Sequence, residues 1–126
     1  MKASLASKRP TPYRQVIRKL ELNDDYLKQA RMNGMGVTDM QLLDLAQALI
    51  NNDVTVLLSL NRNEITDLGV SHLTNAVRIN HNIISLYLGD NLIGDEGARD
   101  VCKVLTKPRS QLTELNLTGR DPEREL

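Results

Sequence analysis

The sequence predicts an α/β fold, a solenoid whose curved parallel sheet carries helices on its convex side. Three observations predict it. An apolar frame recurs with starts at residues 27, 55, 83 and 112. Within each frame apolar residues alternate with polar or variable ones, which is typical of a short strand with one buried face. After the frame the apolar spacing changes to three and four, which is typical of a helix. A repeat of this length is one supersecondary unit that buries its apolar face by stacking on its neighbours.

The frame is clearest at residues 55–65 and 83–93, with apolar side chains at positions four, six and eleven and asparagine at position nine. It is degraded at 27–37, where Met35 stands in place of the asparagine. A fourth copy begins at 112–117 and then loses the pattern, with Arg120 and Pro122 where the asparagine and the last apolar residue would stand. Atypical first and last repeats are expected, because terminal repeats close the stack.

Each frame predicts a strand followed by a bend. Leu58 and Leu60 flank Ser59, and Leu86 and Leu88 flank Tyr87, so the leucines should face inward. The asparagines at position nine, Asn63 and Asn91, should use their side-chain amides to satisfy backbone groups where the sheet ladder stops. Because they recur with the repeat, they are interpreted as scaffold rather than as a functional site.

The second half of each repeat predicts an amphipathic helix. Three sets of residues occupy matching places on the expected buried faces: Leu42, Leu45, Ala46 and Leu49; Val70, Leu73, Thr74 and Val77; and Ala98, Val101, Cys102 and Leu105. Thr38 and Gln41 have the spacing of a capping box. Gly69 and Gly97 lie early in the second and third helices, where a side chain would meet the adjacent turn.

The N-terminal part predicts a flexible basic arm over 1–11 and one repeat domain over 12–126. The helical spacing of Tyr13, Val16, Ile17 and Leu20 indicates a cap helix over 12–22 that covers the first strand. A competing interpretation takes Ile17, Leu20 and Leu22 as another repeat strand. The helix is favoured, because too few residues separate that frame from the next for a helical return. A transit or anion-binding role for the arm is a further alternative to a solvated segment.

The frame and the helices resemble leucine-rich repeats of the ribonuclease-inhibitor type over residues 27–117. The helix, the turn at Asn23-Asp24-Asp25 and the strand at Leu27 are similar to the start of the tropomodulin repeat domain and of some bacterial repeat proteins. Small repeat proteins of this kind also resemble secreted effectors of intracellular bacteria. The resemblance implies a protein partner bound on the concave sheet.

No residue pattern indicates catalysis, and neither an enzyme nor a cofactor is expected. His72 and His81 lack the close paired spacing of metal ligands. Cys102 is interpreted as a small buried core residue rather than as a nucleophile. The acid-rich bends at 89–97 do not have the spacing of a calcium loop. The 16 acidic and 16 basic residues balance, so a nucleic-acid partner is not implied, and no apolar run has the length of a membrane span.

The sequence therefore predicts a non-catalytic module that binds a protein through its concave strand face. Exposed frame positions three, five, seven and eight should carry the contacts. The candidate partner-binding residues are Gln29, Arg31, Leu57, Ser59, Arg62, Ser85, Tyr87, Asp90, Glu114 and Asn116. The alternative is a self-assembling structural protein that forms a homodimer through its open C-terminal strand edge, which the short charged tail would cover poorly. We expect action in the cytoplasm, or in a host cytosol if the chain is a bacterial effector.

Overall fold

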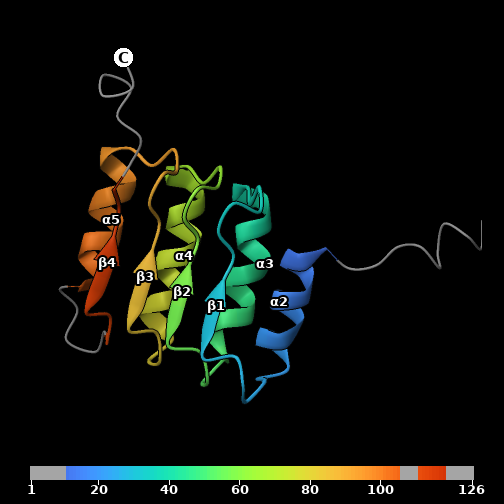
Figure 1. Ribbon diagram of the computed structural model, residues 1–126. Coiled ribbons are helices and arrows are strands. Elements are labelled where there is room, and N and C mark those ends of the chain that lie inside the picture. Colours follow the sequence, from blue (N-terminus) through green and yellow to red (C-terminus); the bar gives the residue numbers. More distant parts are fainter. Residues whose placement is uncertain (1–10, 106–110, 119–126) are drawn as a thin grey trace, which may run out of the picture.

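The computed structural model describes residues 11–105 and 111–118. Four short parallel strands lie side by side in chain order, and each of the first three is followed by a helix (Figure 1). The strands are β1 (Gln29–Arg31), β2 (Leu57–Ser59), β3 (Ser85–Tyr87) and β4 (Glu114–Asn116), and the helices are α2 (Pro12–Glu21), α3 (Asp39–Ile50), α4 (Asp67–Ile79) and α5 (Asp95–Leu105). Ala30 pairs with Leu58, Leu58 with Leu86, and Leu86 with Leu115. This register confirms the repeat frame, including its last, longer step.

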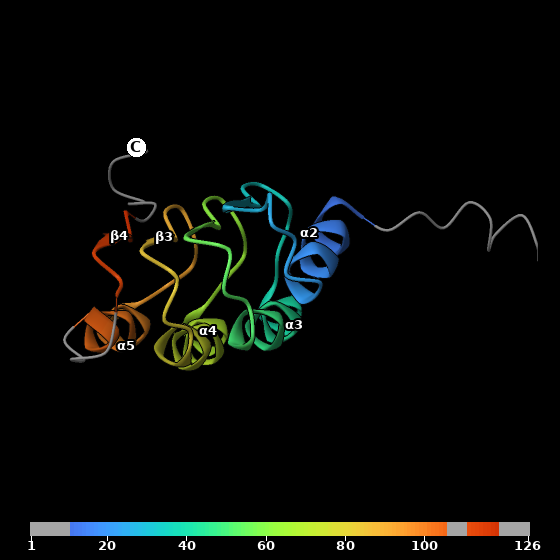
Figure 2. The same ribbon diagram turned by 90° about the horizontal axis from the view of Figure 1, so that it is seen from below.

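The molecule has two layers, a sheet and a row of helices (Figure 2). Helices α3, α4 and α5 form the convex layer, and the strands form the opposite, concave one. The frame leucines of the central strands, Leu58, Leu60, Leu86 and Leu88, are buried between the layers. The predicted faces of α3 and α4 are buried with them. The solenoid predicted from the sequence is therefore confirmed, and its core is almost wholly aliphatic.

The buried face of α5 differs from the prediction. Val101 is buried, but Cys102 and Leu105 are exposed and Ala98 is only partly buried. Ala46 and Thr74, which occupy the position of Cys102 in α3 and α4, are buried. Each of those two helices has a following helix beside it. Within the described residues no helix follows α5. The prediction of a core cysteine was wrong because this position of the repeat becomes buried only where a following helix covers it.

Helix α2 closes the other end of the stack and packs against α3 (Figure 2). It buries Tyr13, Ile17 and Leu20, as predicted, so the alternative strand frame is wrong. The Tyr13 hydroxyl donates a hydrogen bond to the Gln41 carbonyl oxygen at 2.6 Å. Burial is the main reason that the pKa of the Tyr13 phenol is raised well above its usual range. Thr11, which was predicted to belong to the basic arm over 1–11, is the N-cap of this helix, and Leu22 is its C-cap.

Asparagine side chains join successive repeats at the bends after the strands. The Asn63 Oδ1 accepts hydrogen bonds from the backbone amides of Met35 and Val37 at 3.0 and 2.9 Å, and its Nδ2 donates to the Met32 carbonyl at 3.0 Å. Asn91 makes equivalent bonds to the preceding bend, including one from the Ile65 amide at 3.1 Å. The scaffold role predicted for both is confirmed. Asn63 thus serves the bend of the first repeat, in which Met35 replaces the asparagine.

A second asparagine pair, not recognised in the sequence, joins the repeats between each helix and the next strand. Asn52 is buried and donates to the Leu20 carbonyl at 3.1 Å, and Asn80 donates to the Leu49 carbonyl at 2.7 Å. Both also accept bonds from the amides of the following turn. Their separation of one repeat was the signal that could have identified them.

Candidate protein-binding face

The ten predicted partner-binding residues lie on the strands, which form the layer opposite α3, α4 and α5, or on the bends that follow them. Exposed among them are Gln29, Arg31, Arg62, Glu114 and Asn116, and partly buried are Leu57, Ser85, Tyr87 and Asp90. Only Ser59 is buried, with 1 % of its surface exposed. Nine of the ten residues are therefore accessible on one continuous face, which we call the strand face.

Ser59 does not belong to the accessible part of the strand face, which corrects the prediction. Its hydroxyl donates to Asn33 Oδ1 at 2.7 Å, and the Asn61 amide donates to the same oxygen at 2.8 Å. In the next repeat Asn61 Oδ1 accepts from the Gly89 amide at 2.7 Å. Position seven of the frame, expected to be variable and exposed, thus has a structural role in the first two repeats. Asparagine at both Asn33 and Asn61, one repeat apart, was the available signal.

Tyr87 and Glu114 interact directly across β3 and β4. The Tyr87 hydroxyl donates a hydrogen bond to Glu114 Oε1. This bond is the main reason that the pKa of Tyr87 is raised and that of Glu114 is lowered, and Ser85 also helps to lower the pKa of Glu114. The bond ties the Tyr87 side chain to β4, and Tyr87 remains partly exposed.

Arg62 and Asp90 extend the strand face along the bends after β2 and β3. Both have a backbone in the left-handed region, with φ of 57° and 54°. Their amides are held by the neighbouring repeat, because Arg62 N donates to the Gly89 carbonyl at 2.8 Å and Asp90 N to the Thr118 carbonyl at 2.7 Å. The unusual φ is thus fixed by the ladder, and the two side chains line a shallow hollow of about 220 Å³ at this edge.

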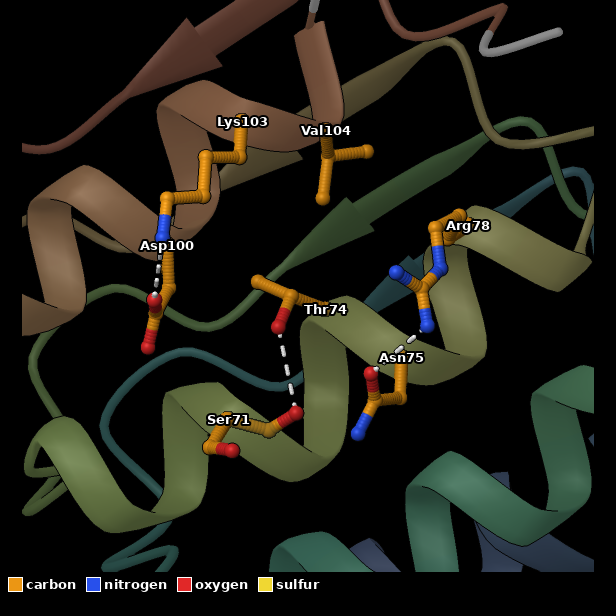
Figure 3. A pocket seen from close by; sticks show the side chains of 7 residues that line it. All are labelled: Ser71, Thr74, Asn75, Arg78, Asp100, Lys103 and Val104. Carbon is orange, nitrogen blue, oxygen red and sulfur yellow. Dashed lines mark hydrogen bonds and ion pairs between the residues drawn. The ribbon is translucent and has the colours of Figure 1, made fainter. Parts of the chain in front are cut away.

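A second hollow, of about 250 Å³, lies on the opposite side of the molecule between α4 and α5 (Figure 3). Its polar groups interact within their own helices: Thr74 Oγ1 donates to the Ser71 carbonyl, Arg78 to Asn75, and Lys103 lies 3.9 Å from Asp100. Such contacts between residues three apart are ordinary for helix surfaces. This hollow is a groove between two packed helices and carries no arrangement suited to catalysis.

Metal-binding and membrane-spanning features are absent from the described part of the chain. Across residues 11–105 and 111–118, no three His, Cys, Asp or Glu side chains gather closely enough to hold a metal ion. None of the helices in that part of the chain combines the length and the hydrophobicity that crossing a membrane requires.

Comparison with known proteins agrees with the architecture. The family described as "Leucine Rich repeat" matches residues 55–73 and 80–102. Curated protein sequences give no match. With four parallel strands in repeat register and helices on the convex side, the chain has the fold of a leucine-rich repeat solenoid.

Two solved structures have a similar fold. One is "Leiomodin-1 Actin-Binding Site 2 (ABS2)", with a TM-score of 0.80, 23 % identity and coverage of 89 % of this chain and 65 % of that one. The other is a tropomodulin C-terminal domain of Caenorhabditis elegans, with a TM-score of 0.75, 20 % identity and coverage of 85 % and 64 %. The chain therefore spans slightly less than two thirds of each neighbour.

Proposed function

We propose that this protein is a non-catalytic module that binds a protein partner through the strand face. The observation that carries the proposal is the partly accessible ring of Tyr87, which is held by Glu114 in a polar surround with Leu57 on the neighbouring strand. Aromatic residues that keep an apolar ring accessible and fix it by a polar tip are frequent anchors of protein interfaces.

The size of the face limits its affinity. Four strands at a spacing of about 4.8 Å give a face roughly 15–20 Å wide. The area of such a face is smaller than the area of a standard interface, which is about 800 Å² per partner. A tight complex would need the bends that carry Arg62 and Asp90, or surfaces outside the sheet. We therefore propose a partner contact of modest affinity for the strand face alone.

The experiment combines partner capture with a direct binding measurement. Purified actin is the first candidate, because one of the two structural neighbours is an actin-binding site of leiomodin-1. A captured protein would be purified, and its Kd measured for wild type, for the double substitution Leu57→Ala with Tyr87→Ala, and for Ile79→Ala, an exposed apolar residue at the end of α4. We expect the double substitution to weaken binding while leaving the folding stability nearly unchanged. Binding that is insensitive to it but lost in Ile79→Ala would contradict the proposal.

Self-association through the C-terminal end is a second candidate function. It is supported by the exposure of Cys102 and Leu105, whose counterparts in α3 and α4 are buried, and by β4, whose outer edge has no strand partner among the described residues. Unpaired edges are normally covered or paired with another chain. The tail with Pro122, expected to cover this end poorly, lies outside the described residues. Asn116→Lys should weaken such a dimer in sedimentation, and a monomer at high concentration for both proteins would contradict it.

The cellular setting is part of the same proposal. We propose action in a cytosol, either that of the producing cell or, for an effector, that of a host cell. Fractionation with an antibody against the purified protein would test it. Recovery of the protein only from the medium or from a membrane fraction would count against it.

A further inference from the structure

The charged side chains of the strand face are separated by sign. Positions three, five and eight of the four repeats carry two arginines in the first two repeats, Arg31 on β1 and Arg62 after β2. They carry two acids in the last two, Asp90 after β3 and Glu114 on β4. No other described residue at these positions is charged. A chain that is neutral overall therefore presents a basic half and an acidic half on one face.

These four charges are not neutralised by one another. The ion pairs found among the described residues are Arg14 with Asp44 and Lys103 with Asp100, both elsewhere. Arg31 donates to the neutral side chain of Gln29 at 2.8 and 3.2 Å, and Glu114 accepts from the Tyr87 hydroxyl. The side chains of Arg31 and Glu114 are thus positioned by neutral neighbours, and their charges are available to interact with a partner.

The region between the charges is apolar or small. Leu57 lies on β2 and the ring of Tyr87 on β3, both partly buried, and Ser59 is covered by its bond to Asn33. A partner that crosses the strands would meet positive charge, then apolar surface, then negative charge. The distance is set by the sheet: three strand spacings of about 4.8 Å give about 14 Å from β1 to β4. An extended chain advances about 3.3 Å per residue, so this distance corresponds to roughly four residues.

We propose that the strand face binds an extended protein segment that lies across the strands, with an acidic side chain over β1 and β2 and a basic side chain over β3 and β4, separated by about three apolar or small residues. This inference rests on the proposed function and specifies the chemistry of its partner. The opposite charges fix which end of the segment lies over β1, since the reversed placement brings like charges together. The apolar centre supplies contact area, and the charges determine the direction in which the segment lies across the strands.

Synthetic peptides test the proposal. One seven-residue peptide would carry two glutamates at one end, three apolar residues in the middle and two lysines at the other end. A second would have the same composition with glutamates and lysines interleaved. NMR titration of the labelled protein suits weak binding and locates the contact through the shifted amides. We expect the first peptide to bind at the strand face at least about tenfold more tightly than the second, and the difference to shrink at about 1 M salt, where exposed charges are screened.

Charge reversal provides the matched variants. Arg31→Glu with Arg62→Glu makes both halves acidic, and it should shift the preference to a peptide with lysines at both ends. Asp90→Lys with Glu114→Lys should shift it to a peptide with glutamates at both ends. Lys28→Glu, a reversal at an exposed residue just before β1, should leave the preference unchanged. Amide spectra would first establish that each variant is folded, and a variant that unfolds would be replaced by its two single substitutions.

Several outcomes would overturn the proposal. Equal binding of the separated and interleaved peptides would exclude an ordered charge contact, while a protein partner that still depends on Tyr87 and Leu57 would preserve the proposed function. Preferential binding of a single-stranded oligonucleotide at the strand face, or loss of a dimer on Arg31→Glu, would identify another occupant and reject the peptide.

Discussion

The Asp39 carboxylate occupies the space that a side chain at Gly69 would need. A Cβ at Gly69 would lie 2.2 Å from Asp39 Oδ1, and the same oxygen accepts a hydrogen bond from the Thr66 amide at 2.8 Å. The relationship recurs one repeat later, where a Cβ at Gly97 would lie 2.4 Å from an Asp67 oxygen. The glycines of the helix starts are therefore matched to the aspartate of the preceding repeat, and the acid joins two repeats rather than serving its own helix alone.

Gly69→Ala should lower the free energy of unfolding. Alanine ordinarily favours a helix by about 1 kcal/mol relative to glycine, but overpacking here would displace Asp39, for a net loss of about 1–3 kcal/mol. Denaturant unfolding measures the change. The matched control repeats the substitution in an Asp39→Ala background, where the clash is absent and the loss should be smaller. An equal loss in both backgrounds would show that the aspartate is not responsible.

Leu86→Ala should destabilise the protein by about 2–5 kcal/mol, because Leu86 is buried in β3 between neighbours on both sides. Leu115→Ala, at the same frame position in β4, removes the same atoms from a partly buried site and should have a smaller effect. Thermal and chemical unfolding of both variants would test the expectation. Unchanged stability of Leu86→Ala would contradict the repeat register.

Asn91→Ala should destabilise the fold through lost hydrogen bonds rather than through a large cavity. It would leave the Ile65 amide and the Leu88 carbonyl without a side-chain partner and the Leu60 carbonyl with Asn63 alone, and the expected loss is about 2–4 kcal/mol. Asn75→Ala, at an exposed position on α4, is the control and should stay within about 0.5 kcal/mol of wild type. Comparable losses in the two variants would argue against a special role for the bend asparagines.

The Tyr87–Glu114 bond predicts a linked titration. The pKa of Glu114 is lowered, so the bond to the carboxylate is present above that pKa and weakens as the pH falls through it. The pKa of Tyr87 is raised, because the phenolate can no longer donate and would face a carboxylate. In Glu114→Gln the pKa of Tyr87 should move back down toward the usual value for tyrosine. NMR of the tyrosine ring carbons separates the three tyrosines, and an unchanged Tyr87 titration would exclude the bond in solution.

Much of the fold was accessible to sequence reasoning because its signal repeats. Leu58 and Leu86 occupy the same frame position, and each repeat supports the interpretation of the other. The pairs missed, Asn52 with Asn80 and Asn33 with Asn61, were also periodic, but polar residues at isolated positions do not show which backbone groups they reach. Their role became evident only from hydrogen bonds between residues about one repeat apart.

The sequence by itself determined the repeat register, the strand and helix of each unit and the side of each strand that faces inward, because these depend on local periodicity. Only the tertiary structure decided which positions are covered. Ser59 is buried because Asn33 of the preceding repeat reaches it, and Cys102 is exposed because no described helix follows α5. Burial in a stacked protein depends on the neighbouring unit as well as on the residue's own place in the repeat, and the separation of charge across the strand face likewise exists only once the strands lie side by side.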